Sequence, residues 1–229
     1  MYQKTTLDNG LRIITATMPH TQAVCVSFFI GVGSRYETEA QAGISHFVEH
    51  LLFKGTQKRP TAREICEAIE GVGGIINGGT DKELTVYWCK VAQAHLHMVL
   101  DVLADVLLHS RFDPQEIEKE RRVIIEEINM SKDSPSQQVH MLIDELLWPN
   151  HPLGRDIAGS KKSVTGITRD MMLDYLANQY LPGSTVIAIA GNIQHQEVIT
   201  AIDQTLGDWT ARRNQPGYIA CGPESPGAV

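Results

Sequence analysis

Two histidines and a glutamate lie close together in the stretch SHFVEHLLFKGT, residues 45–56. His46 and His50 are four residues apart and Glu49 follows His46 by three, so all three share one face of an α-helix. The rest of the stretch is mostly apolar, which indicates that this polar face is enclosed. Burying three ionisable groups costs free energy unless a partner compensates them. Two imidazoles one helical turn apart suit a tetrahedral zinc ion.

The same three residues have the types that a zinc hydrolase needs. A catalytic zinc site takes a third protein ligand and leaves a fourth position to water. The ion lowers the pKa of that water to about 7, and a carboxylate beside it can accept the proton. Glu49 is placed to be this general base, and His-x-x-Glu-His is the inverzincin signature. The alternative is a chance pattern on a solvated helix, which the apolar flanks disfavour.

Composition and charge exclude several other classes of protein. The chain has 229 residues, 42% of them hydrophobic, and is long enough to bury a core without disulfides. A net charge of −7 argues against a general nucleic-acid binder. No apolar run approaches the roughly 20 residues of a membrane helix. We therefore expect neither a nucleic acid nor a membrane as partner.

The N-terminal sequence and the cysteines indicate the compartment. The first residues alternate as in a strand and show neither the basic leader nor the apolar segment of an export signal. The four cysteines form no CxxC pair, which favours a reducing environment. These features predict a cytoplasmic bacterial protein, with a mature protein of the mitochondrial matrix as the alternative.

Hydrophobic periodicity and breaking residues predict the elements that position the motif. Strands are expected at 2–7, 11–17, 23–32, on both sides of Asp81-Lys82 and at 184–191. Helices are expected at 44–53, from the capping box Thr61/Glu64 to the glycines at 71–74, at 93–108, from Asp113-Pro114 to Pro135, at 139–148, at 169–180 and at 197–206. This mixed order lacks a regular βαβ alternation and favours the α+β class.

Several longer motifs resemble a known family. They are GVGSRYE at 31–37, GISHFVEHLLFKGT at 43–56, RRVIIEEI at 121–128, and segments at 101–112, 151–159 and 181–193. Over nearly the whole chain, to about residue 210, the sequence resembles the M16 (pitrilysin) metallopeptidases, within them the branch of processing proteases and the mitochondrial processing peptidase β-subunit. The resemblance implies a two-layer sandwich, with a largely antiparallel sheet packed by helices as in LuxS/MPP-like metallohydrolase domains. It also implies a zinc endopeptidase with one Zn²⁺ per chain, acting on oligopeptides or unfolded, presequence-like segments.

The resemblance also implies a third metal ligand downstream of the motif. The family takes it from a glutamate, and two neighbours compete here, Glu126 and Glu127. Alignment of VIIEEI with the family pattern favours Glu127, with Glu126 as an outer or solvent-facing neighbour. Glu120 matches a family carboxylate that orients a ligand histidine. The alternative for Glu120 is an exposed charge in the run EIEKERR.

The segment GGIINGGTDKE, 73–83, matches an edge strand that pairs with the substrate backbone in family members. Asn77 lies where the family uses an asparagine to hold the peptide near the metal. Gly78 stands where the family usually has alanine. An edge strand recognises a peptide through its free N–H and C=O groups. The alternative is an ordinary turn-rich hairpin.

The resemblance covers one half of the usual M16 architecture, in which two homologous halves enclose a chamber. We expect a zinc-binding catalytic domain at 1–212 and, at 213–229, a linker toward a second half. The expected partners are a peptide substrate and a second M16 half-domain, in the same longer chain or another subunit, or a second copy in a homodimer. The isolated chain is expected to bind zinc but to cleave peptides poorly.

Two other functions are compatible with parts of the sequence. A non-catalytic scaffold subunit of an M16 heterodimer is the main alternative, but such subunits typically lose residues of the HxxEH motif, which is intact here. A structural zinc domain fits less well, because such sites are closed by four ligands, usually with cysteine, and no cysteine lies near the motif.

Overall fold

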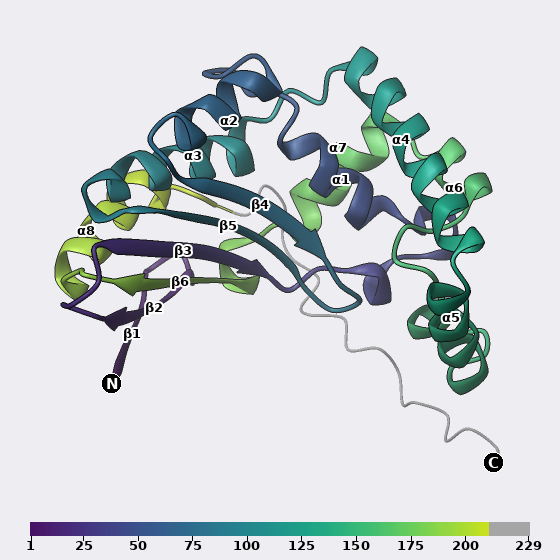
Figure 1. Cartoon of the computed structure of the whole chain (residues 1–229), viewed down its shortest axis with the longest axis horizontal. Helices are drawn as coiled ribbons and strands as arrows, with labels where there is room; N and C mark the ends of the chain where they lie inside the picture. The colour runs from purple at the N-terminus through teal and green to yellow at the C-terminus, as the bar shows by residue number, and fades with distance from the viewer. Residues whose placement is uncertain (211–229) are drawn as a thin grey trace.

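The computed structural model describes residues 1–210 and has a six-stranded sheet with helices packed on it (Figure 1). The strands are β1 (Tyr2–Thr6), β2 (Arg12–Thr17), β3 (Ala23–Ile30), β4 (Ile75–Thr80), β5 (Thr85–Ala92) and β6 (Thr185–Gly191). Their order is β1-β2-β6-β3-β5-β4. Only the β2–β6 pair is parallel among these strands. The predicted α+β class with a largely antiparallel sheet is confirmed.

The helices lie between and after the strands. They are α1 (Ile44–Leu52), α2 (Ala62–Glu70), α3 (Leu96–His109), α4 (Pro114–Asp133), α5 (Pro135–Leu147), α6 (Lys161–Gly166), α7 (Arg169–Gln179) and α8 (His195–Leu206). In β3 and β5 buried residues alternate with more exposed ones, so one face of the sheet lies against the core. None of the helices in the described residues is both long and apolar enough to cross a lipid bilayer.

Strand β6 makes the C-terminal part of the described chain integral to the sheet. It pairs with β2 on one side and with β3 on the other, in the middle of the strand order. Its residues from Val186 to Gly191 alternate in burial, as expected of a strand with one face against the core. The predicted boundary at 212 and the predicted linker at 213–229 lie outside the described residues.

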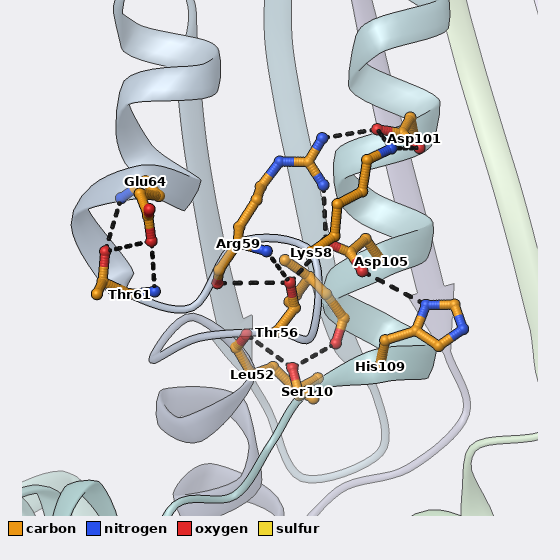
Figure 2. Close-up of polar contacts among 11 residues, drawn as sticks. Leu52, Thr56, Lys58, Arg59, Thr61, Glu64, Asp101, Asp105, His109 and Ser110 are labelled. Carbon is orange, nitrogen blue, oxygen red and sulfur yellow. Dashed lines mark hydrogen bonds and ion pairs between the residues drawn. The ribbon is translucent and has the colours of Figure 1, made fainter.

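A charged cluster lies at the end of α1, where Lys58 and Arg59 of the following loop pair with Asp101 and Asp105 of α3 (Figure 2). The buried Asp105 of α3 accepts hydrogen bonds from the hydroxyl of Thr56 at 2.6 Å and from the guanidinium of Arg59 at 2.7 Å. The hydroxyl of Ser110 donates to the carbonyl of Leu52, the last residue of α1, at 3.0 Å. These contacts fix α1 relative to α3. Five apolar residues of α1 lie in the core: Ile44, Phe47, Val48, Leu51 and Leu52.

Candidate metal centre

The first turn of α1 is anchored by Glu37, the last residue of the motif GVGSRYE. Its buried carboxylate accepts hydrogen bonds from the backbone N–H groups of Gly43 and Ser45, both at 2.8 Å, and from the Ser45 hydroxyl at 2.6 Å. These donors would otherwise be unsatisfied at a helix N-terminus. Burial raises the pKa of the Glu37 carboxyl, and the hydrogen bonds from Ser45 and Gly43 oppose this rise.

Gly43 is required just before α1 because of its backbone conformation. Its φ is +93°, and a Cβ there would lie 2.5 Å from the carbonyl oxygen of Ala158. The chain can therefore turn into α1 at this point only with a glycine. The start of α1 is thus fixed at Ile44, two residues before His46.

The two histidines and Glu127 bring three potential ligand atoms together. The Nε2 atoms of His46 and His50 are 3.2 Å apart. Oε2 of Glu127, on α4, lies 3.8 Å from the first and 3.6 Å from the second. A tetrahedral zinc ion with bonds of 2.0–2.2 Å separates its ligand atoms by about 3.4 Å. The triangle therefore has the size that a shared zinc ion requires.

Helix α4 presents Glu127, and not its neighbour Glu126, to the histidines. Glu126 is exposed, and its carboxylate accepts a hydrogen bond from the Asn129 amide at 3.3 Å. The Glu127 side chain is 42% exposed, so a position beside the triangle is open to solvent. This is the arrangement of a site with room for a water or substrate.

The two histidines differ in the hydrogen-bond partner of Nδ1, the ring nitrogen that points away from the triangle. Nδ1 of His50 lies 3.1 Å from Oε2 of Glu120, so this carboxylate can accept the Nδ1 proton and leave Nε2 free for the triangle. Glu120 is buried, and its other oxygen pairs with Lys54 at 2.8 Å. Glu120 is therefore a buried residue in contact with His50, and not an exposed charge; its role in orienting a ligand histidine stays a prediction.

Nδ1 of His46 is buried and has no hydrogen-bond partner in the described part of the chain. Burial, and then the proximity of His50, lower the pKa of His46 from 6.5 to about 4. His46 is therefore neutral at pH 7, which is the form that binds a metal ion.

Glu49 lies beside the histidines on the same helix. Potential ligand atoms of His46, Glu49 and His50 are all within 4.8 Å of one another. Burial raises the pKa of the Glu49 carboxyl; the nearby His50 and a hydrogen bond from Thr80 lower it, and Glu127 raises it. A carboxylate with a raised pKa accepts a proton more readily near neutral pH, as a general base must.

Strand β4 borders this cluster and is an edge strand, because it pairs only with β5 among the described strands. The Thr80 hydroxyl donates to Oε2 of Glu49 at 3.5 Å. A Cβ at Gly78 would lie 2.9 Å from Oε1 of Glu49 and 2.8 Å from the Phe53 ring. Gly78 thus leaves room for the Glu49 carboxylate, and the alanine that is usual in the family would press on it.

Asn77 lies on the other face of β4, because successive strand residues alternate. It is exposed, and its side-chain oxygen accepts the backbone N–H of Gly78 at 2.8 Å. The structure thus brings Gly78, but not the Asn77 side chain, to the side of Glu49. It leaves both residues on the edge strand.

Comparison with known proteins decides the family. Residues 12–161 match the family described as Insulinase (Peptidase family M16), and residues 166–228 match the Peptidase M16 inactive domain. This chain belongs to the M16 peptidase family. The second match begins shortly before α7, and the β6 strand within it is a central strand of the same sheet.

Curated M16 relatives are named as zinc proteases. The chain is 39% identical over 217 residues to the uncharacterized zinc protease YmxG of Bacillus subtilis, covering 95% of this chain and 53% of that protein. It is 38% identical over 212 residues to the uncharacterized zinc protease ML0855 of Mycobacterium leprae, covering 93% and 47%. The chain therefore spans about half the length of these relatives.

Solved structures show the same M16 fold. A protease from Helicobacter pylori superimposes with a TM-score of 0.89 at 23% identity, over 93% of this chain and 52% of that one. The first half of the periplasmic protease PqqL from Escherichia coli superimposes with a TM-score of 0.87 at 24% identity, over 98% and 49%. At these identities the likeness concerns the fold.

Sequence reasoning did not assign roles to Glu37, which holds the start of α1, or to Lys54 and Thr80, which contact Glu120 and Glu49. Glu37 belonged to a recognised motif, but its contact with Ser45 depends on a turn that no periodicity describes. Lys54 follows His50 by four residues, which was the available signal for a shared helix face. Thr80 lies two residues after Gly78, so strand alternation could have placed both on one face.

Proposed function

We propose that this chain is the zinc-binding catalytic half of an M16 endopeptidase, with His46, His50 and Glu127 as the metal ligands. The observation that carries the proposal is the triangle of ligand atoms, with sides of 3.2, 3.6 and 3.8 Å, beside the carboxylate of Glu49. The names of the curated relatives support zinc as the ion. One zinc ion per chain is proposed, because the described residues hold one group of His, Cys, Asp or Glu side chains close enough to share an ion, His46, Glu49 and His50, and Glu127 lies beside it.

The chemistry follows from the residues around the triangle. Bound zinc would supply Lewis-acid activation of water and of the scissile carbonyl. Glu49 accepts the proton of the attacking water and passes it to the leaving amine. Thr80 donates a hydrogen bond to the Glu49 carboxylate. Glu120 holds the ring of His50 through Nδ1, so that Nε2 faces the triangle.

The proposed substrate is an extended peptide that adds to the free edge of β4. Unfolded or presequence-like segments and oligopeptides can offer a continuous backbone to this edge, whereas folded proteins cannot. Gly78 places the strand backbone close to Glu49, so a peptide paired there would run past the metal. Asn77 is proposed to hold the peptide from the exposed side of the edge.

Full activity is proposed to require a second M16 half. The chain spans about half the length of its curated relatives. In PqqL of Escherichia coli it matches 49% of the structure of the first half and 25% of the structure of the periplasmic protease itself, so further segments accompany the matching part there. The second half belongs to the same longer chain or to another subunit. A location in the bacterial cytoplasm is part of the proposal.

The test combines metal analysis with peptide hydrolysis, on the chain alone and together with its second half. We expect one zinc ion per chain, and a Glu49→Gln variant that keeps zinc and loses turnover by 10²-fold or more. A Glu145→Gln variant is the matched control, because Glu145 is an exposed residue of α5 and should leave activity unchanged. Turnover that survives Glu49→Gln refutes the mechanism.

The same assay separates the peptidase from a scaffold subunit. A scaffold shows no metal-dependent hydrolysis even with its second half, and Glu49→Gln then changes nothing. A peptidase loses hydrolysis on chelation and regains it when zinc is added back.

A further inference from the structure

One carboxylate joins a lysine to a proposed metal ligand. Oε1 of Glu120 lies 2.8 Å from Nζ of Lys54, and Oε2 lies 3.1 Å from Nδ1 of His50. The Glu120 side chain is only 8% exposed, so water offers it few other partners. Each oxygen of Glu120 therefore has one protein partner, and the carboxylate is held from both sides.

Lys54 is itself held close to the end of α1. Its backbone N–H donates to the carbonyl of Leu51 at 3.1 Å, which continues the turn of the helix by one bond. The Lys54 side chain is 30% exposed, and its ammonium group reaches back over the last turn to Glu120. Lys54 and His50 thus both lie at the C-terminal end of α1 and both contact the Glu120 carboxylate of α4.

We propose that Lys54 is a positioning residue for the metal centre and acts through Glu120. With Lys54 present, Oε1 is occupied and Oε2 stays directed at Nδ1 of His50. Without it, the carboxylate has one partner and can rotate toward solvent, and the ring of His50 loses its orientation. This inference rests on the zinc site of the proposed function, and it adds a requirement that the ligand set does not contain.

The direction of the expected effect distinguishes this role from simple electrostatics. Lys54 is a positive charge near a cation site, so charge repulsion alone predicts that its removal strengthens zinc binding. Positioning through Glu120 predicts the opposite. Removal of an outer partner of a ligand histidine typically weakens metal binding 10- to 100-fold. Lys54 contacts the outer partner and not the histidine itself, so we expect its removal to weaken zinc binding by roughly tenfold, the lower end of this range.

The experiment measures zinc affinity by competition with a chelating dye, on the chain itself and without any peptide. The variants are Lys54→Met, Lys54→Arg, Glu120→Gln and the double variant Lys54→Met/Glu120→Gln. We expect roughly tenfold weaker binding for Lys54→Met, a change within about threefold for Lys54→Arg, and a double variant no weaker than Glu120→Gln alone. Lys58→Met is the control, because Lys58 lies on the same loop as Lys54 but pairs with Asp101 of α3 and not with Glu120.

The outcomes separate this inference from the proposed function. Unchanged or tighter zinc binding by Lys54→Met, or a loss that adds to that of Glu120→Gln, overturns the role of Lys54. Absence of zinc binding by the wild-type chain overturns the metal site itself, and hydrolysis plays no part in either result. Melting of the metal-free proteins monitors folding, and Lys54→Gln replaces Lys54→Met if the latter unfolds.

Discussion

The carboxylate of Glu37 accepts both the backbone N–H and the hydroxyl of Ser45, at 2.8 and 2.6 Å, one residue before His46. The Ser45 hydroxyl also lies 2.7 Å from the hydroxyl of Tyr175 on α7. A buried group from outside the helix thus sets the first turn of α1. The orientation of the metal-binding face depends on it.

Replacement of Glu37 by alanine is expected to destabilise the metal-free chain by about 3 kcal/mol, because it leaves buried donors of Gly43 and Ser45 without an acceptor. Ser45→Ala removes only the hydroxyl and keeps the backbone N–H that donates to Glu37, so it should cost less, about 1 kcal/mol. Urea unfolding of the chelated protein measures both values. Equal effects of the two variants would contradict the central role of the Glu37 carboxylate.

The neighbours Glu126 and Glu127 should differ sharply in their effect on zinc. Glu127→Gln replaces the carboxylate ligand with a neutral amide. It is expected to weaken zinc binding by more than about 100-fold, which exceeds the usual effect of losing a residue that only holds a ligand. Glu126→Gln changes only an exposed contact with Asn129 and should leave the affinity within about twofold. Dye competition and metal analysis measure both. The reverse ranking would move the third ligand to Glu126.

The metal-free chain should become less stable as the pH is lowered, because the unfolded chain protonates His46 more readily than the folded chain does. The folded pKa of His46 is lowered from 6.5 to about 4, so the unfolded chain binds this proton at a higher pH than the folded chain. The folded state therefore loses stability as the pH falls from 6.5 toward 4, by up to about 3 kcal/mol. Urea unfolding at several pH values measures the slope. His46→Gln should reduce the slope in this window, and an unchanged slope would count against the lowered pKa.

Loss of a residue of the charged cluster at the end of α1 should lower the free energy of unfolding more than loss of an exposed ion pair does. Figure 2 shows Arg59 reaching Asp101 and Asp105, with contacts of 2.6 and 2.7 Å. Asp105→Ala leaves the partly buried guanidinium without one partner and also frees the Thr56 hydroxyl, so we expect a loss of about 3 kcal/mol. Glu67→Ala breaks the exposed pair with Arg63 and should cost less than about 0.5 kcal/mol. Thermal or urea unfolding compares the two.

The Thr80 hydroxyl is expected to affect turnover and not substrate binding. Thr80→Val removes the donor that orients the Glu49 carboxylate and should lower kcat by roughly tenfold with KM nearly unchanged. A hydrogen bond to a charged group contributes about 1.5 kcal/mol, and this loss outweighs the accompanying rise in the pKa of Glu49. Thr80→Ser keeps the hydroxyl and should restore most of kcat. Steady-state kinetics with the second half present are the measurement, and equal losses in both variants would point to packing instead.

Much of the secondary structure could be predicted from local sequence. The capping box of Thr61 and Glu64 at the start of α2 is present, with reciprocal hydrogen bonds. Helix α4 begins at Pro114 as predicted, and the side chain of Asp113 caps it by accepting the backbone N–H of Gln115. Helix α6 was not predicted, because six residues are too few to show a helical period.

The sequence alone determined that His46, Glu49 and His50 share one face of a helix, because i, i+3 and i+4 spacing has this consequence in any α-helix. It also determined the α+β class, through the order and periods of the elements. Periodicity on α4 could group Glu120 with Glu127, but it could not say which face of α4 would turn toward α1.

Only the tertiary structure decided that Glu127 and not Glu126 reaches the histidines, and that Glu120 joins His50 to Lys54. The physical reason is that these contacts depend on the rotation and distance between two helices far apart in the chain. Packing of the core sets both quantities, whereas local spacing sets only which side chains leave a helix together.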